Sequence, residues 1–183
     1  MTANTRFIPL CILALLASAC IDAPETERAV AALTDLPTAF TECGGTPNDP
    51  ESVYTDDTNP GAVYSAPWKA ETPGLGLYQG TQHITNIGGY TVSHTFSTPG
   101  TGPSTISYGY RKMRNAGKAA IYWDGQYFST ISLYAPDNVY RCEFTFYDMP
   151  PGVHTVMVKV LNQREPASGG TYVNADYFRR YDF

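Results

Sequence analysis

The sequence predicts an all-β fold, a sandwich of two antiparallel β-sheets. Its 183 residues include 14 Tyr, 16 Gly and 14 Pro, while only 16% are charged. This composition suits short strands joined by turns better than long exposed helices. About nine or ten short stretches of alternating apolar and polar residues, spaced roughly 8–15 residues apart and separated by turn-forming residues, are typical of such a sandwich.

The clearest alternation lies in residues 140–161. Between residues 142 and 147 the apolar side chains fall on one face of an extended chain, and a second run places Val156, Val158 and Val160 on one face. The sequence Pro150-Pro151-Gly152 separates the two runs. Two runs of period two around a Pro-Gly turn predict a β-hairpin with one buried face.

The remaining strands are predicted from shorter patterns. Asp124-Gly125 stands between two of them and is a strong signal for a two-residue hairpin turn. Apart from the central hairpin, strands are expected at residues 52–55, 63–68, 79–84, 90–97, 106–110, 119–123, 127–134 and 171–181.

The first residues are predicted to be a leader rather than part of the fold. Arg6 is followed by an apolar run at residues 7–17, and residues 16–19 read Leu-Ala-Ser-Ala, which a signal peptidase accepts. Cys20 comes next, so this end resembles the lipobox of bacterial lipoproteins, in which the cysteine is lipidated. The alternative is an ordinary secretory signal cut near Ala19. A transmembrane anchor is disfavoured because a span needs about 20 apolar residues.

The chain is therefore divided into a signal peptide at residues 1–19, a lipidated Cys20 with a flexible tether at residues 20–50, and a sandwich at residues 51–183. The resemblance to lipoproteins implies a protein anchored by lipid in the bacterial cell envelope. Asp22 does not directly follow Cys20, so the usual inner-membrane retention signal is missing. The expected location is the outer membrane or the cell surface.

The four cysteines predict one disulfide. Cys11 leaves with the leader and Cys20 is assigned to lipid, which leaves Cys43 and Cys142 in an oxidising compartment. A bond between them would join the loop at residues 41–50 to the sandwich. The alternative is a pair of buried thiols.

The charge pattern excludes nucleic acid as a partner. The chain has a net charge of −5 and no basic stripe, whereas phosphate contacts require clustered Lys and Arg. One basic cluster is present, formed by Arg111, Lys112, Arg114 and Lys118. It is interpreted as a solvated loop, with contact to an acidic polysaccharide or to lipid headgroups as the alternative.

A series of short motifs suggests a family. In chain order they are Asp56-Asp57, Val63-Tyr64-Ser65 leading to Trp68, and the stretches at residues 78–83 (YQGTQH), 117–125 (GKAAIYWDG), 151–156 (PGVHTV) and 173–177 (VNADY). Their order resembles the galactose-binding-like jelly rolls, over about residues 52–183. That family includes carbohydrate-binding modules and bacterial surface domains. The resemblance implies the fold, whereas function has to be derived from a site.

Exposed aromatic rings are the expected contacts to a sugar, because a ring face packs against the C–H face of a pyranose. Side chains at strand ends or in loops are suitably placed for this role. The alternative is that they pack in the core, where aromatic residues of a sandwich are common. The candidate ligand-binding residues are Trp68, Tyr78, Trp123, Tyr127 and Tyr134.

A structural calcium ion is the expected metal, if one is bound. Asp56 and Asp57 lie in an oxygen-rich turn, and Asp176 is a candidate ligand from the last strand because related carbohydrate-binding modules carry calcium near their chain ends. The alternative is an Asx-turn that only closes the loop. The three histidines (His83, His94 and His154) lack a paired ligand spacing, so zinc is not expected.

These observations predict a surface lipoprotein that binds carbohydrate without catalysis. The alternative is a protein-interaction or envelope-structural module on the same fold, with a protein of the envelope as partner. A small hydrolase is a third hypothesis. The sequence has no Gly-x-Ser-x-Gly elbow, phosphate loop or dinucleotide fingerprint, so the chain is not expected to be an enzyme.

Overall fold

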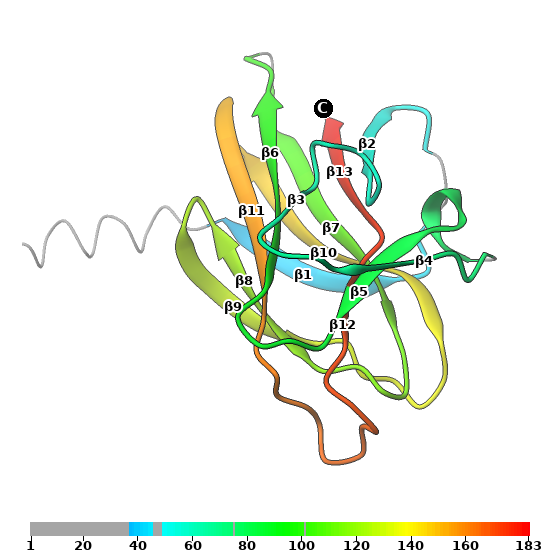
Figure 1. Cartoon of the computed structure of the whole chain (residues 1–183). Helices are drawn as coiled ribbons and strands as arrows, with labels where there is room; N and C mark the ends of the chain where they lie inside the picture. Colours follow the sequence, from blue (N-terminus) through cyan, green and yellow to red (C-terminus); the bar gives the residue numbers. More distant parts are fainter. Residues whose placement is uncertain (1–36, 46–48, 75, 101) are drawn as a thin grey trace, which may run out of the picture. The chain divides into compact units, whose positions relative to one another are not determined.

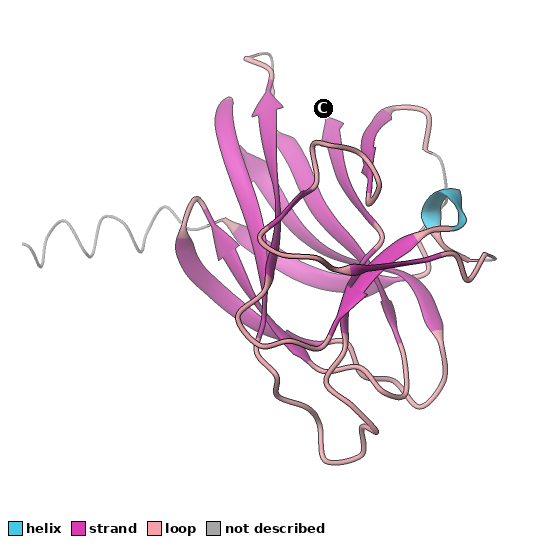
Figure 2. Ribbon diagram, in the orientation of Figure 1, coloured by secondary structure: helices cyan, strands magenta, loops and turns pink. Residues whose placement is uncertain are grey.

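Two five-stranded sheets share one hydrophobic core, and a third sheet of three strands lies beside them (Figures 1 and 2). The computed structural model describes residues 37–45, 49–74, 76–100 and 102–183. The predicted signal peptide, Cys20 and most of the predicted tether lie outside these residues. The described part contains one short 3-10 turn, η1 (Tyr78–Gly80), and none of its residues form a helix long and apolar enough to cross a membrane.

All pairs between named strands are antiparallel, as predicted. The first sheet has the order β1 (Thr38–Cys43), β10 (Val139–Met149), β7 (Ser104–Lys112), β13 (Tyr177–Asp182) and β2 (Ser52–Asp56). The second has the order β3 (Val63–Tyr64), β6 (Thr91–Thr98), β11 (Gly152–Val160), β8 (Lys118–Trp123) and β9 (Gln126–Ser132). The third has the order β12 (Val173–Ala175), β5 (Gln82–Thr85) and β4 (Lys69–Glu71). The predicted all-β antiparallel sandwich is confirmed.

The central hairpin was predicted incorrectly, although its two strands exist. β10 pairs with β1 and β7, while β11 pairs with β6 and β8, so the two strands belong to different sheets. Pro150 and Pro151 lie between them, and neither has an amide proton to donate to a strand ladder. The turn is therefore a corner between the sheets. The predicted buried face is correct, because Phe146 and Val158 are fully buried in the common core.

The disulfide is present, and the chain around it is more ordered than predicted. Cys43 and Cys142 are bonded, with sulfur atoms 2.08 Å apart. Strand β1 pairs with β10 from Thr38 to Cys43, so this part of the predicted tether (residues 20–50) is a strand of the sandwich. The six residues of β1 (TAFTEC) do not alternate between polar and apolar, so the sequence does not distinguish this edge strand from a loop.

The hairpin predicted at Asp124-Gly125 is confirmed. It joins β8 to β9, whose register ends with Trp123 opposite Gln126. Asp124 and Gly125 have φ angles of 46° and 81°, the left-handed conformation that a tight two-residue hairpin turn requires at both positions. Asp124 also accepts hydrogen bonds from the amide of Thr155 (2.7 Å) and pairs with His154 Nδ1 (2.9 Å), which fixes the hairpin against β11.

Candidate functional site

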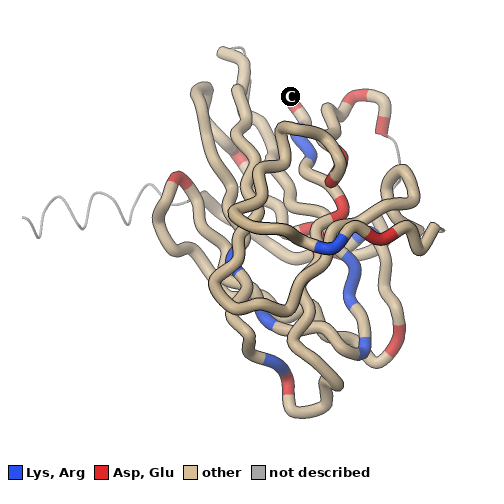
Figure 3. Tube along the Cα trace, viewed as in Figure 1, with Lys and Arg blue, Asp and Glu red and all other residues tan. Residues whose placement is uncertain are grey.

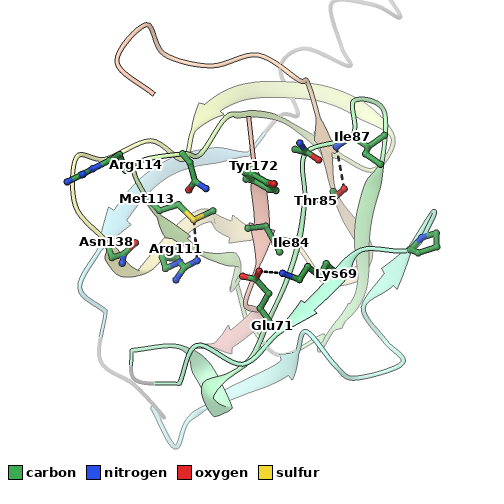
Figure 4. Close-up of a pocket in the computed structure, with 13 residues that line it drawn as sticks. Lys69, Glu71, Ile84, Thr85, Ile87, Arg111, Met113, Arg114, Asn138 and Tyr172 are labelled. Carbon is green, nitrogen blue, oxygen red and sulfur yellow. Dashed lines mark hydrogen bonds and ion pairs between the residues drawn. The ribbon is translucent and has the colours of Figure 1, made fainter. Parts of the chain in front are cut away.

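A polar pocket of about 600 Å³ opens beside the three-stranded sheet, within the size range of small-ligand sites. Its wall combines residues of β4, β5 and β7, the loops that follow β5 and β7, and single residues that precede β4, β10 and β12. Figure 4 shows these side chains around the opening. The lining residues are Pro67, Lys69, Glu71, Ile84, Thr85, Asn86, Ile87, Arg111, Met113, Arg114, Asn115, Asn138 and Tyr172.

The residues that line the pocket carry a net positive charge. Three lining residues are basic (Lys69, Arg111 and Arg114) and one, Glu71, is acidic, which gives 3 − 1 = +2. The whole chain carries −5, and Figure 3 shows several basic positions in the lower half of the trace, around β5 and β12 of Figure 1. We refer to this site as the basic pocket.

Strand β4 supplies an ion pair to the pocket wall. Lys69 and Glu71 are two residues apart, so their side chains leave the same face of the strand. Lys69 Nζ lies 2.9 Å from Glu71 Oε1, and Gln82 donates to Glu71 Oε2 at 3.0 Å. The hydrogen bond from Lys69, followed by that from Gln82 and the charges of Lys69 and Arg111, lowers the pKa of Glu71. Glu71 is therefore ionised at neutral pH, and both of its oxygens are already used.

Arg111 is a buried cation of the pocket wall. Its exposed fraction is 9%, and its Nε has no hydrogen-bond partner among the described residues. Its Nη2 contacts Met113 Sδ at 3.2 Å, and a thioether sulfur is a weak acceptor. No carboxylate of the described residues lies within ion-pair distance of this guanidinium.

The position of Arg111 is fixed from two sides. The fully buried side chain of Asn174 accepts from the Arg111 amide and donates to the Arg111 carbonyl, both at 2.8 Å. The guanidinium carbon lies 5.9 Å from the ring centre of Tyr140, within the range of a cation–π contact. Gly76 lies against this ring, because a Cβ added at Gly76 would be 2.6 Å from it.

Another part of the wall depends on close packing between two loops. Gly117 donates its amide to the carbonyl of Tyr172 at 2.7 Å, and Tyr172 donates to the carbonyl of Asn115 at 3.2 Å. A Cβ added at Gly117 would lie 2.6 Å from the carbonyl oxygen of Thr171, so only glycine allows this approach. As a result Tyr172, labelled in Figure 4, and Asn115 both line the same pocket.

None of the five predicted ligand-binding aromatic residues lines the basic pocket. Trp68 and Trp123 are buried, each with an exposed fraction of 7%, and pack in the core. As ring platforms for a sugar these two predictions are wrong, because a sandwich core takes up large apolar rings. Tyr78 and Tyr134 are half-buried. Tyr127 is 57% exposed, on β9.

The aspartates predicted as calcium ligands are buried but do not converge as a set of three. Asp57 accepts from Thr81 Oγ1 at 2.6 Å and pairs with His83 Nδ1 at 2.6 Å, which occupies both of its oxygens. Asp56 Oδ1 and Asp176 Oδ2 are buried without a partner among the described residues. Within that part of the chain no group of three or more His, Cys, Asp or Glu side chains is arranged to hold a metal ion.

Burial has a marked effect on Asp176. Loss of hydration raises its pKa to about 8, with a further rise from the nearby charges of Asp57 and Asp56 and a partial opposing effect of the amide of Tyr78. That amide donates to Asp176 Oδ1 at 2.9 Å. The remaining oxygen therefore takes up a proton more readily than a carboxylate in water does.

The histidines have structural partners. His94 contacts the carbonyl of Gly61 at 2.8 Å and Thr55 Oγ1 at 3.2 Å, and its ring stacks against Phe178 in the core. His154 contacts the carbonyl of Pro150 at 3.1 Å in addition to Asp124. Their ring nitrogens are thus engaged within the fold.

Sequence reasoning missed most of the basic pocket. Tyr172, Asn138 and Glu71 were not singled out, because each is unremarkable among its sequence neighbours. Only the cluster around residues 111–118 gave a signal, and it divides in the structure. Arg111 and Arg114 line the pocket, whereas Lys118 forms an ion pair with Glu165 at 3.0 Å.

The fold is similar to that of solved carbohydrate-binding modules. A CBM35 from Cellvibrio japonicus Abf62 has a TM-score of 0.50 and 14% identity, over 70% of this chain and 91% of that chain. A family 35 carbohydrate binding module from Clostridium thermocellum has a TM-score of 0.50 and 13% identity, over 72% of this chain and 98% of that one. A cycloisomaltooligosaccharide glucanotransferase from a Paenibacillus species reaches 0.50 and 14%, over 72% of this chain but only 18% of that enzyme.

No protein family and no curated protein matches the sequence. At 13–14% identity the structural likeness concerns the fold alone. It confirms the predicted fold, a β-sandwich of the kind found in carbohydrate-binding modules.

Proposed function

We propose that this protein binds a glycan in the basic pocket and does not catalyse its conversion. One observation carries the proposal: a pocket of sugar size presents the ring of Tyr172 together with the amide side chains of Asn86, Asn115 and Asn138. An aromatic ring for the apolar face of a sugar and amides for its hydroxyls are the groups that such recognition requires. The carbohydrate-binding modules of the same fold support this reading.

The composition of the pocket also argues for binding rather than hydrolysis. Glycoside hydrolysis in its common form uses two carboxyl groups on either side of the scissile bond. Glu71 is the one carboxylate among the described residues that line the pocket. It is ionised and paired with Lys69, so it has no proton to give to a leaving group.

Immobilised glycans test the proposal. We expect the full chain to bind at least one glycan on an array, and Tyr172→Ala to weaken that binding roughly tenfold, the effect of losing one good ring contact. Tyr127→Ala is the matched control, because Tyr127 is exposed but lies outside the pocket. Failure to bind any glycan, or equal losses in both variants, would refute the proposal.

The lipid anchor on Cys20 is part of the same proposal and is supported by the leader sequence. The sandwich begins by Thr38, so residues 21–37 would connect the lipid to the domain. In this arrangement the domain faces glycans at the outer membrane or the cell surface, as the missing retention signal at residue 21 suggests.

Calcium binding near Asp56 and Asp176 is a second proposal for the same domain. Its support is the pair of buried, unpartnered carboxylate oxygens, which fits the oxygen preference of calcium but supplies only part of the 6–8 ligands that the ion takes. We expect calcium chloride to raise the melting temperature of the chain relative to EDTA, and Asp176→Asn to remove that difference. Identical melting curves with calcium and with EDTA would exclude the site.

A further inference from the structure

We propose that the glycan in the basic pocket carries an anionic group, a carboxylate or a sulfate, and that Arg111 binds this group. The inference rests on the proposed glycan binding and adds the chemical class of the ligand. It depends on how the three cations of the pocket are paired, which differs from one cation to the next.

Two of the cations already have acidic neighbours. Lys69 is held by Glu71 at 2.9 Å. Arg114 lies 3.9 Å from Asp137 and also donates from Nε to the carbonyl of Pro136 at 3.1 Å. Both members of the Arg114–Asp137 pair are largely exposed, with side-chain exposures of 78% and 88%, so water and salt screen this charge.

Arg111 differs from both. It is nine-tenths buried, its Nε has no partner, and no carboxylate lies within 4.0 Å of it among the described residues. Burial of a cation is unfavourable unless an anion or oxygen acceptors replace the lost water. Nε itself is closed to solvent, so an anionic group of a ligand in the pocket that Arg111 lines would balance the charge through the other guanidinium nitrogens.

The pocket holds the guanidinium ready for such a group. Asn174 fixes the Arg111 backbone through two hydrogen bonds, and the Tyr140 ring and Met113 Sδ flank the side chain. Little side-chain entropy remains to be lost when a ligand binds. The planar fork of an arginine matches the paired oxygens of a carboxylate or a sulfate, so the contact is directional as well as charged.

Glu71 does not take the place of the ligand's anion. Its two oxygens accept from Lys69 and from Gln82, and its nearest cation is Lys69. The charge of Arg111 acts on Glu71 only as the weakest of the causes that lower its pKa. The β4 ion pair therefore leaves the guanidinium of Arg111 to the pocket.

The test compares matched glycans on the full chain. An array of neutral, uronic-acid and sulfated glycans first identifies which glycans bind. Calorimetry then compares the affinity of each bound acidic glycan with that of its neutral counterpart. The counterpart of a uronic acid is the carboxyl-reduced sugar, and that of a sulfated glycan is the desulfated sugar. We expect the neutral counterpart to bind 10- to 100-fold more weakly, the usual effect of losing a charge-assisted hydrogen-bonded contact. This comparison uses the unaltered protein and also distinguishes carboxylate from sulfate.

Variants assign the effect to Arg111. Arg111→Gln is expected to lower the affinity for the acidic glycan by the same 10- to 100-fold. Lys112→Gln is the control, because it removes the same charge at the next residue, which does not line the pocket. It is expected to change the affinity less than threefold. Equal losses in both variants would show that general charge attracts the glycan and would overturn the role of Arg111. Thermal melting confirms that each variant is folded.

The outcomes separate this inference from the proposed function. Neutral glycans bound as tightly as their acidic counterparts, with Tyr172→Ala still harmful, would overturn the anionic ligand and leave glycan binding in place. A chain that binds no glycan of any charge would overturn both.

Discussion

Loss of the Cys43–Cys142 disulfide is expected to lower the free energy of unfolding by at most about 4.7 kcal/mol. The two cysteines are 99 positions apart, so the bond closes a loop of 99 + 1 = 100 residues in the unfolded chain. In the chain-entropy description, a loop of about 100 residues corresponds to ~4.7 kcal/mol at 25 °C. Reduction frees that loop and makes the unfolded state more probable.

The local effect of reduction is expected at β1. This strand lies at the edge of its sheet and pairs only with β10 among the described strands, and most of its side chains are exposed. It therefore buries little apolar surface of its own, and without the disulfide it can separate from β10 without unfolding the core. Partial opening of this kind reduces the loss in global stability below the value for the full loop.

Two measurements check this expectation. Guanidinium unfolding with and without reductant gives the change in free energy, and hydrogen exchange reports the protection of the amides at residues 38–43. A double variant, Cys43→Ser with Cys142→Ser, should match the reduced protein and should not respond to reductant. Unchanged unfolding midpoints together with unchanged β1 protection would refute the reasoning.

Three further predictions concern other parts of the chain. Asp176→Asn is expected to weaken the pH dependence of stability, because the pKa of Asp176 is raised in the folded protein to about 8. Its contribution to stability is therefore complete below about pH 4, the unfolded pKa, and is lost at up to ~1.4 kcal/mol per pH unit as the pH rises from there through 8. Denaturant unfolding at pH 5 and pH 7 in EDTA checks this, and parallel pH curves for the two proteins would contradict it. Gly117→Ala is expected to lower the free energy of unfolding by about 1–3 kcal/mol, because its Cβ would lie 2.6 Å from the Thr171 carbonyl oxygen. Gly100→Ala is the control, because a Cβ there meets nothing within 4 Å. Equal melting temperatures of the two variants would contradict the prediction. Cys20→Ser is expected to abolish incorporation of labelled fatty acid and to release the protein from the membrane fraction, and a variant that keeps the label would disprove lipidation at this residue.

Most of the strands could be predicted from the sequence, although β1 and β4 were not, and the pairing between strands could not be predicted. Alternation of apolar residues shows which face of β10 and which face of β11 enters the core, and Phe146 and Val158 lie there as expected. The opposite face of β10 is buried as well, at Glu143 and Thr145, which the alternation does not predict. The same pattern arises whether two strands pair with each other or face each other from opposite sheets. Pro150 and Pro151 favour a corner, but a Pro-Gly sequence is equally common in hairpin turns, so the residues alone did not decide the topology.

The pocket was largely hidden in the sequence because its parts come from distant segments. Lys69 and Glu71 reach Tyr172 only because β5 pairs with β4 on one side and with β12 on the other. No spacing of residues within a single segment predicts that arrangement. The candidate aromatic residues were chosen because they lie near predicted turns. A position near a turn does not distinguish a buried ring such as Trp123 from an exposed ring such as Tyr127.

The basic cluster shows what a structure adds to a count of charges. In the sequence its four cations are equivalent, and together they indicate only a solvated surface or an acidic partner. In the fold Lys118 is paired with Glu165, Arg114 is screened by water, and Arg111 is buried with no carboxylate of the described residues within ion-pair distance. A paired or screened cation adds little to recognition, whereas a buried and unpaired one favours an anionic ligand strongly. Specificity for acidic glycans is therefore expected to follow Arg111 and not the number of positive charges around it.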